Sequence, residues 1–268
     1  MLDCEHGLLP LHPSGATEVI AAIHGVRDGP SALVRIPATG HGTGSGSEGV
    51  NWQIKYALDS GARGEKGLVL FLDYPISNGG NQKVYWYQWY ALSLQSNTND
   101  DNIFSQVSTP SQAQEVVISS RFPPQGRRGF GSSYTQENWD IQTAGEYLNV
   151  ANKSVIVLVQ IETREGVQNV KAIAEVDGID GLFIGPYDLS NALGYPPPSP
   201  DPHPEVEKVI QDILRVAHEA GKKCAMYCIS GAQAARRAAE GFDMINVTSD
   251  VGAMQSGLAA EYKAAASV

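Results

Sequence analysis

The sequence is poor in basic residues and in cysteine, and it has no long apolar run. Lysine and arginine number 19 against 29 aspartate and glutamate residues, which gives a formal net charge of −10. A surface with this balance repels phosphate groups, so nucleic acids and anionic membranes are poor partners. No apolar stretch approaches the roughly 18 residues that a membrane span needs, and no basic segment with an apolar signal core opens the chain. We therefore expect a soluble, cytoplasmic protein.

The number of cysteines and the length of the chain limit its possible disulfides and its number of domains. The chain of 268 residues has three cysteines, Cys4, Cys224 and Cys228. An odd number this small does not indicate a disulfide framework. Because Cys224 and Cys228 lie in KCAMYC without neighbouring metal ligands, we expect buried free thiols. With 42% hydrophobic residues the chain can form one large domain with a full core, and a single barrel of about 250 residues is within this size.

Strand-like and helix-like segments alternate regularly from residue 154 onward. Apolar runs typical of buried strands occupy residues 154–161, 181–185, 223–228 and 244–248, and helix-like segments occupy residues 166–176, 204–220 and 231–240. Parallel strands need a crossover between them, and strands buried on both faces are apolar throughout. The pattern therefore predicts an α/β fold in which helices cover a parallel sheet.

Two carboxylates follow neighbouring strands of this predicted sheet. Glu162 ends the run VLVQI, and Asp188 follows the run GLFIG, 26 positions after Glu162, which one βαβ unit accounts for. In a parallel barrel both side chains would meet at the carboxyl-terminal mouth, where barrel enzymes build their sites. Adjacent carboxylates repel each other unless a cation lies between them, and Mg²⁺ takes one or two carboxylates together with substrate oxygens and water. The spacing leaves open a simpler alternative, in which Glu162 caps the following helix and Asp188 caps the next turn.

The same residues carry a resemblance to a known family. Residues 159–196, VQIETREGVQNVKAIAEVDGIDGLFIGPYDLSNALGYP, with RFPPQGRRGFGSSY before them and HPEV after them, resemble the HpcH/HpaI aldolase family. These are class II, metal-dependent pyruvate aldolases related to 2,4-dihydroxyhept-2-ene-1,7-dioate aldolase, and the resemblance covers roughly residues 1–64 and 107–255. It implies a TIM (β/α)8-type barrel with a divalent metal, Mg²⁺, Mn²⁺ or Co²⁺, on Glu162 and Asp188, where the metal also holds pyruvate oxygens.

The resemblance also implies the groups that transfer the proton. In LDCEHG, His6 matches the family's acid/base histidine, and in IKYALDSG, Asp59 matches its partner. Arg35, in LVRIP, matches the arginine that holds the pyruvate carbonyl oxygen. The chemistry needs these residue types, because a histidine moves protons near neutral pH and a guanidinium stabilises a developing enolate oxygen.

Further residues around the two carboxylates are expected to bind substrate. Gln160 precedes Glu162 by two positions, so it points to the same face of the strand and is placed to orient a metal-bound water. The turn Gly185, Pro186 and Tyr187 lies between the predicted strand and Asp188, and we expect it to contact the substrate together with Arg35.

The chain departs from the family pattern in two places. It opens at MLDCEHG, so we expect a barrel that lacks the first strand and the first helix. Residues 65–106 form an atypical insert within the single barrel domain, rich in Tyr, Trp, Asn and Gln, although GLVLFL could replace the missing fourth strand. Three interpretations of the insert are a lid, an interaction loop, and translated intervening sequence, which we favour because the flanks rejoin the pattern once it is removed.

The resulting prediction is a carbon–carbon lyase that cleaves a 4-hydroxy-2-oxo acid to pyruvate and an aldehyde. Two alternatives stay open, a related lyase or decarboxylase of the oxaloacetate type and a catalytically dead truncated barrel. The expected partner is a small 2-oxo acid, without nucleic acid or membrane. The segment GAMQSGLAAEYKAAASV is typical of a final helix, and the resemblance implies packing of this helix in a homo-oligomer.

Overall fold

The computed structural model describes most of the carboxyl-terminal part of the chain and shorter pieces before it. The described residues are 107–131, 135–138 and 141–267, together with 2–3, 15, 18–20, 22, 34–35, 55, 58–59, 65–66, 68–69 and 84–88. His6 and Cys4 lie outside these residues. All structural statements below concern the described part of the chain.

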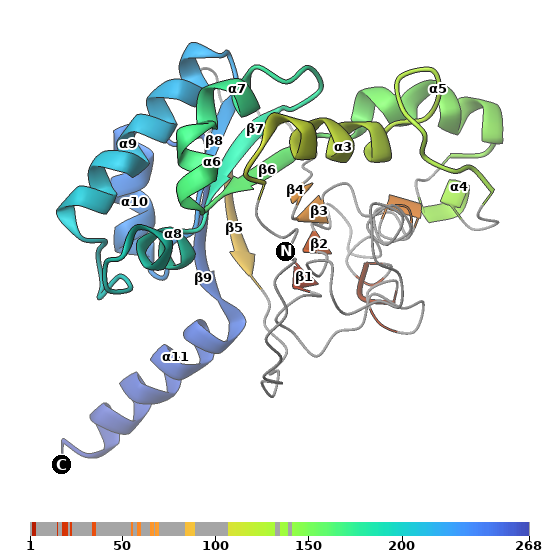
Figure 1. Ribbon diagram of the computed structural model, residues 1–268. Helices are drawn as coiled ribbons and strands as arrows, with labels where there is room; N and C mark the ends of the chain where they lie inside the picture. The colour runs from red at the N-terminus through yellow and green to blue at the C-terminus, as the bar shows by residue number, and fades with distance from the viewer. Residues whose placement is uncertain are drawn as a thin grey trace, which may run out of the picture.

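The strands form two sheets, of three and six strands (Figure 1). The smaller sheet has the order β1 (Leu2–Asp3), β2 (Val34–Arg35) and β3 (Glu65–Lys66), all parallel. The larger sheet has the order β4-β6-β7-β8-β9-β5. Its strands are β4 (Leu68–Val69), β5 (Val84–Gln88), β6 (Leu158–Ile161), β7 (Gly181–Ile184), β8 (Lys223–Met226) and β9 (Met244–Ser249). Only β4 runs antiparallel to its neighbour among these described pairs, so the core of this sheet is parallel.

Helices connect and cover these strands. They are α3 (Pro110–Ser120), α4 (Thr135–Asn138), α5 (Ala144–Ser154), α6 (Arg164–Gln168), α7 (Val170–Ala174), α8 (Pro186–Leu193), α9 (Pro204–Glu219), α10 (Gly231–Glu240) and α11 (Asp250–Ala265). Side-chain hydroxyls of Thr109, Thr163 and Ser230 cap α3, α6 and α10 by accepting hydrogen bonds from free N–H groups of the first turn. In Figure 1, α9 and α10 lie against the sheet, whereas α11 projects away from it.

The two faces of the parallel strands bury different residues. On β6, Val159 and Ile161 join the large core beneath the helices, whereas Leu158 packs with Phe183, Ala225 and Met244 in a smaller cluster on the other face. Side chains alternate between faces with a period of two, so successive residues of one apolar run serve both clusters. This explains why the runs are apolar throughout, and it places Gln160 on the face of the smaller cluster.

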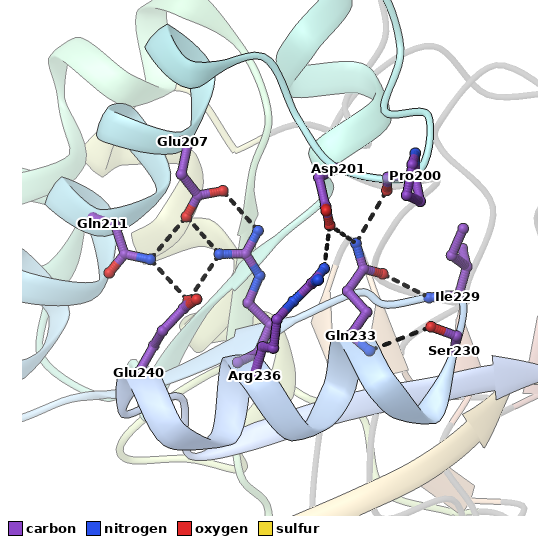
Figure 2. Close-up of polar contacts among 10 residues, drawn as sticks. Pro200, Asp201, Glu207, Gln211, Ile229, Ser230, Gln233, Arg236 and Glu240 are labelled. Atoms are coloured by element: carbon purple, nitrogen blue, oxygen red, sulfur yellow. Dashed lines mark hydrogen bonds and ion pairs between the residues drawn. The ribbon is translucent and has the colours of Figure 1, made fainter.

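A polar network joins α9 to α10 (Figure 2). Arg237 of α10 donates from Nη2 to Glu207 Oε2 of α9 at 2.7 Å and from Nη1 to Glu240 at 2.8 Å. Further along α10, Gln233 donates to the Pro200 carbonyl and accepts from the Ile229 N–H. The network therefore ties the segment after β8 to α9 and to the loop before it.

The structure confirms the predicted α/β fold with a parallel sheet and refines its boundaries. Residue 154 still belongs to α5, so the strand predicted over 154–161 is shorter and begins at Leu158. The helix predicted over 166–176 is interrupted at Asn169, which separates α6 from α7. The other three predicted strands and two predicted helices lie at the expected positions. Closure into a TIM (β/α)8-type barrel and loss of its first elements stay predictions.

Two pieces of the insert at residues 65–106 form strands in the larger sheet. Leu68–Val69, within the GLVLFL run, lies beside β6 as a replacement for a fourth strand would, but it runs antiparallel to β6. Val84–Gln88 extends the other edge, parallel to β9. The origin of the insert as translated intervening sequence is still a prediction. In the described part of the chain, no helix has both the length and the apolar character to cross a bilayer.

Candidate functional site

Glu162 lies immediately after β6 and is almost completely buried. Its exposed fraction is 2%, and that of Gln160 is 3%. The Gln160 Nε2 group donates a hydrogen bond to Glu162 Oε2. Buried charges are costly unless their oxygens are hydrogen-bonded, so the amide both stabilises the carboxylate and orients it. The prediction that Gln160 shares a face with Glu162 is confirmed, and its direct partner is the carboxylate itself.

Gly185 makes room for this carboxylate from the neighbouring strand. The parallel register pairs Gln160 with Phe183 and Ile161 with Ile184, so Gly185 follows directly beside Glu162. A Cβ atom built on Gly185 would lie 2.3 Å from Glu162 Oε2 and 2.4 Å from Gln160 Nε2. Since non-bonded atoms do not approach so closely, a side chain at position 185 would force the ends of these two side chains to shift.

Asp188 is carried by the helix that begins at Pro186. It lies in the first turn of α8 and is exposed, in contrast to Glu162. The alternative that Glu162 caps the next helix is wrong, because Thr163 caps α6 by accepting from the Gly166 N–H at 2.9 Å. The cap position of α8 is Gly185, and no side chain caps that end. The two predicted metal ligands therefore follow adjacent strands β6 and β7 at the same end of the sheet.

Two polar residues on the same face were missed by sequence reasoning. Tyr227 follows β8 and stacks edge-on against Tyr187, with ring centroids 6.1 Å apart. Asn246, on β9, is fully buried and donates from Nδ2 to the Cys228 carbonyl at 2.7 Å, while its Oδ1 has no partner within the described part. The period of two in KCAMYC and MINVT would have placed both residues on the face of Gln160. Tyr187 is 38% exposed, as a residue at the rim of a site would be.

A second cluster surrounds Asp59, which is 3% exposed. Arg128 Nη2 donates to Asp59 Oδ1 at 2.9 Å, and Lys55 pairs with Oδ2. The guanidinium of Arg128 is fully buried, whereas the Lys55 side chain is 29% exposed. Both oxygens of the carboxylate therefore accept from cationic groups, one of them deep in the protein.

Aromatic side chains enclose the buried guanidinium. Arg128 lies over the Phe122 ring, 4.6 Å from its centroid, and also donates to the Tyr147 hydroxyl at 2.5 Å. Phe122 and Tyr147 pack edge to face, 5.6 Å between centroids, and the half-exposed Phe130 covers both. Burial raises the pKa of Tyr147 to about 12, so its hydroxyl keeps its proton at neutral pH.

Backbone contacts of the segment RFPPQGRR place Arg128 in this cluster. The Arg127 N–H donates to the Ile118 carbonyl and the Arg128 N–H to the Arg121 carbonyl, each at 2.8 Å. Gly126 sits so close to the end of α3 that an added Cβ would lie 2.3 Å from the Ile118 oxygen. The segment can fold back over α3 only because this position has no side chain.

Of the remaining predicted residues, Arg35 lies on β2 beside β1, in register with Asp3. Its side chain, like His6, lies outside the described part, so the proximity of Arg35, His6 and Asp59 stays a prediction. Cys224 and Cys228 are buried free thiols, as predicted. Burial raises the pKa of the Cys228 thiol to about 12, which leaves it unreactive.

The carboxylates that follow β6 and β7 are oxygen donors of the type that a hard divalent cation takes. Glu162 and Asp188 offer carboxylate oxygens, and the position that Gly185 leaves free of a side chain is filled by Glu162 Oε2 and Gln160 Nε2. No group of three or more His, Cys, Asp or Glu side chains gathers among the described residues. Magnesium and manganese accept such a set, because they complete their coordination with water and substrate oxygens.

The chain is similar to known proteins in sequence and in fold. Residues 100–256 match the family model HpcH/HpaI aldolase/citrate lyase. The 5-keto-4-deoxy-D-glucarate aldolase of Shigella dysenteriae serotype 1 is 39% identical over 150 residues, 56% of this chain and 57% of that protein. The 2-keto-3-deoxy-L-rhamnonate aldolase of Klebsiella pneumoniae is 40% identical over 145 residues, 54% of this chain and 53% of that protein. The chain therefore spans little more than half the length of these relatives.

A solved structure extends the similarity in fold over the whole chain. The HpcH/HpaI aldolase from Desulfitobacterium hafniense DCB-2 superposes with a TM-score of 0.73 at 22% identity, covering 100% of this chain and 83% of that one. At this identity the match is evidence for the fold alone.

Proposed function

This chain belongs to the HpcH/HpaI aldolase/citrate lyase family, and we propose that it is a carbon–carbon lyase with divalent-metal-dependent aldol chemistry. The proposed reaction is the reversible cleavage of a 4-hydroxy-2-oxo acid to pyruvate and an aldehyde. The observation that carries the proposal is the buried Glu162 carboxylate, held by Gln160 against the side-chain-free Gly185. The two relatives named above are aldolases whose names give keto-deoxy sugar acids as substrates.

In this proposal Glu162 and Asp188 hold the metal. When bound, Mg²⁺, Mn²⁺ or Co²⁺ would supply positive charge that polarises the 2-oxo group of the substrate. Gln160 keeps the Glu162 carboxylate oriented, because its amide donates to the Oε2 atom. Burial strengthens this hydrogen bond and excludes water from the carboxylate.

The protein's own groups would transfer the proton. His6 takes the proton from the 4-hydroxyl group, the bond between C3 and C4 breaks, and its electron pair passes to the enolate of pyruvate while the aldehyde leaves. Protonation of C3 then completes pyruvate. Asp59 orients His6, and Arg35 stabilises the enolate oxygen. We propose these roles from the match to the family pattern. The structure adds that Asp59 is buried and hydrogen-bonded to Arg128.

The turn between β7 and α8 would bind the substrate. Gly185 and Pro186 bring the chain close to Glu162, and Tyr187 lies at the rim with its ring against Tyr227. An aromatic pair at this place would contact the part of the substrate beyond the pyruvate unit. The substrate is therefore proposed as a small 2-oxo acid.

The proposed architecture is a barrel that assembles with further copies of itself. The parallel order β6-β7-β8-β9 supports a TIM (β/α)8-type barrel, since sequential neighbours in one sheet are its building pattern. Helix α11 exposes Met254, Leu258 and Tyr262 at intervals of four residues, which form one apolar stripe. We expect this stripe to be covered in a cytoplasmic homo-oligomer, and light scattering of the full chain measures its mass.

Calorimetric titration of Mn²⁺ in the presence of oxalate, an analogue of the pyruvate enolate, tests the metal site. We expect saturable binding to the full chain and a loss of at least about tenfold in affinity in Glu162→Gln and in Asp188→Asn. Glu165→Gln is the matched control, because Glu165 is exposed in the first turn of α6 and should leave the affinity unchanged. Equal binding by all four proteins would contradict the assignment of Glu162 and Asp188.

Pyruvate release, coupled to lactate dehydrogenase, tests the reaction. We expect metal-dependent cleavage of a 4-hydroxy-2-oxo acid such as 5-keto-4-deoxy-D-glucarate. Turnover of oxaloacetate alone would favour the related decarboxylase, and metal binding without any turnover would indicate a catalytically dead barrel.

A further inference from the structure

Burying the guanidinium of Arg128 costs free energy. The contacts that it makes among the described residues do not offset this cost, so they do not explain its burial as a contribution to stability. Its side chain is completely buried, yet its Nε and Nη1 groups have no hydrogen-bond partner among the described residues. Replacing a buried ion pair by apolar side chains is often neutral or favourable for stability. Unsatisfied buried N–H groups add to the cost. A group kept in place under these conditions calls for a function beyond packing.

The contacts that Arg128 makes orient its guanidinium toward the Asp59 carboxylate. Nη2 donates to Asp59 Oδ1 and to the Tyr147 hydroxyl, and the flat face of the guanidinium lies on the Phe122 ring. The hydroxyl of Tyr147 keeps its proton at neutral pH, so the only anion in these contacts is Asp59. The rings therefore fix the plane of the guanidinium, and the guanidinium in turn fixes one oxygen of the carboxylate.

We propose that Arg128 is a positioning residue of the reaction, which holds the Asp59 carboxylate in the orientation from which Asp59 partners the general base. This inference rests on the proposed function, because the role of Asp59 beside His6 comes from it. Arg128 touches neither substrate nor metal in this proposal. It acts through Asp59, as Phe122, Tyr147 and the backbone around Gly126 act through Arg128.

The charges that face Asp59 determine the expected effect of removing Arg128. Within the described part they are Lys55, on the same helical segment, and Arg128, on the segment after α3, while α5 contributes the neutral Tyr147. Removing the buried guanidinium leaves more of the negative charge of Asp59 uncompensated. A histidine that pairs with Asp59 then holds its proton more firmly and loses it only at higher pH.

The test is an NMR titration of the His6 imidazole in the full chain with Mg²⁺, assigned with His6→Gln. In Arg128→Gln we expect the titration midpoint to rise by roughly half a pH unit or more. In Arg128→Lys, which keeps the cation, it should stay near that of the unaltered protein. Asp59→Asn should lower it. Arg127→Gln is the matched control from the same segment, because Arg127 pairs only at the surface with Glu115 in the described part and should change nothing.

The titration needs no substrate, so its failure is distinguishable from failure of the proposed function. An unchanged midpoint in a folded Arg128→Gln, with a lowered midpoint in Asp59→Asn, would reduce Arg128 to a structural residue and overturn the proposal. No change in Asp59→Asn would overturn both the pairing of Asp59 with His6 and the role of Arg128. Where turnover is measured, kcat of Arg128→Gln should fall roughly tenfold to a hundredfold with KM little changed, and Arg128→Lys should recover part of it.

Discussion

Helices α9 and α11 have the same length, 16 residues, but opposite surroundings. In α9 the apolar residues Ile210, Ile213 and Leu214 are buried in the large core between the helices and the sheet. In α11 the apolar residues Met254, Leu258 and Tyr262 follow the same kind of helical spacing, yet they are 58%, 65% and 77% exposed. Periodicity therefore predicts that a segment is helical, but not which surface its apolar face will cover.

Truncation of a buried residue should give the largest difference in stability between the two helices. Ile213→Ala on α9 should lower the free energy of unfolding by about 2–5 kcal/mol, because it removes buried methyl groups and leaves a cavity. Leu258→Ala on α11 should change it by less than about 0.5 kcal/mol. Denaturant unfolding of dilute protein compares the two, and equal losses would show that α11 is packed as tightly as α9.

The network between α9 and α10 should have the next largest effect (Figure 2). The side chain of Arg237 is 5% exposed and pairs with Glu207 and Glu240, and these contacts outweigh burial and raise the pKa of its guanidinium. Arg237→Met should cost about 2 kcal/mol, because it leaves Glu207 partly buried without its cation. Arg236→Met is the control, since Arg236 is 56% exposed and pairs with Asp201 at the surface, where such a contact contributes about 0.5 kcal/mol. Equal losses of unfolding free energy in Arg237→Met and Arg236→Met would show that burial of Arg237 adds nothing to its ion pairs.

The smallest expected effect is a pH dependence of the unfolding free energy, which comes from Asp243 near the carboxyl-terminal end of α9. Burial opposes the charged form of Asp243, but hydrogen bonds from the Cys224 N–H, from His218 of α9 and from Lys223 outweigh it. The pKa of Asp243 is therefore lowered below its ordinary value. A lowered pKa stabilises the folded state above the unfolded pKa, about 3.9, and this contribution is lost as the pH falls through the folded value.

Asp243→Asn measures that contribution. The difference in unfolding free energy between the unaltered protein and this variant should shrink as the pH falls from about 5 toward 3. A difference that grew between pH 5 and 3 would mean that the sign of the assigned shift is wrong. Asp212→Asn, on the exposed side of α9, provides the comparison.

Much of the fold could be predicted because local rules and tertiary contacts agree in the carboxyl-terminal half. Strands β7, β8 and β9 coincide with apolar runs, and α10 lies between its cap at Ser230 and the left-handed Gly241. The start of β6 was misplaced since apolar residues such as Val155 continue from the end of α5 into the strand. The antiparallel direction of β4 beside β6 could not be predicted, because strand direction depends on the path of the chain between the strands.

The candidate site divides in the same way. The positions of Glu162 and Gly185 follow from strand ends in the sequence, and the structure brings them together as the parallel register requires. The contact between Asp59 and Arg128 joins residues 69 positions apart, and no local pattern signals it.

The sequence by itself determined the alternation of strands and helices, the family and the acidic residues that follow β6 and β7, because these depend on neighbours along the chain and on residue types. Only the tertiary structure decided that Gln160 holds Glu162, that Arg128 reaches Asp59 and that α11 is left uncovered in the single chain. Contacts between distant segments depend on how the elements pack, and the free energy of packing is shared among many residues rather than encoded at one position.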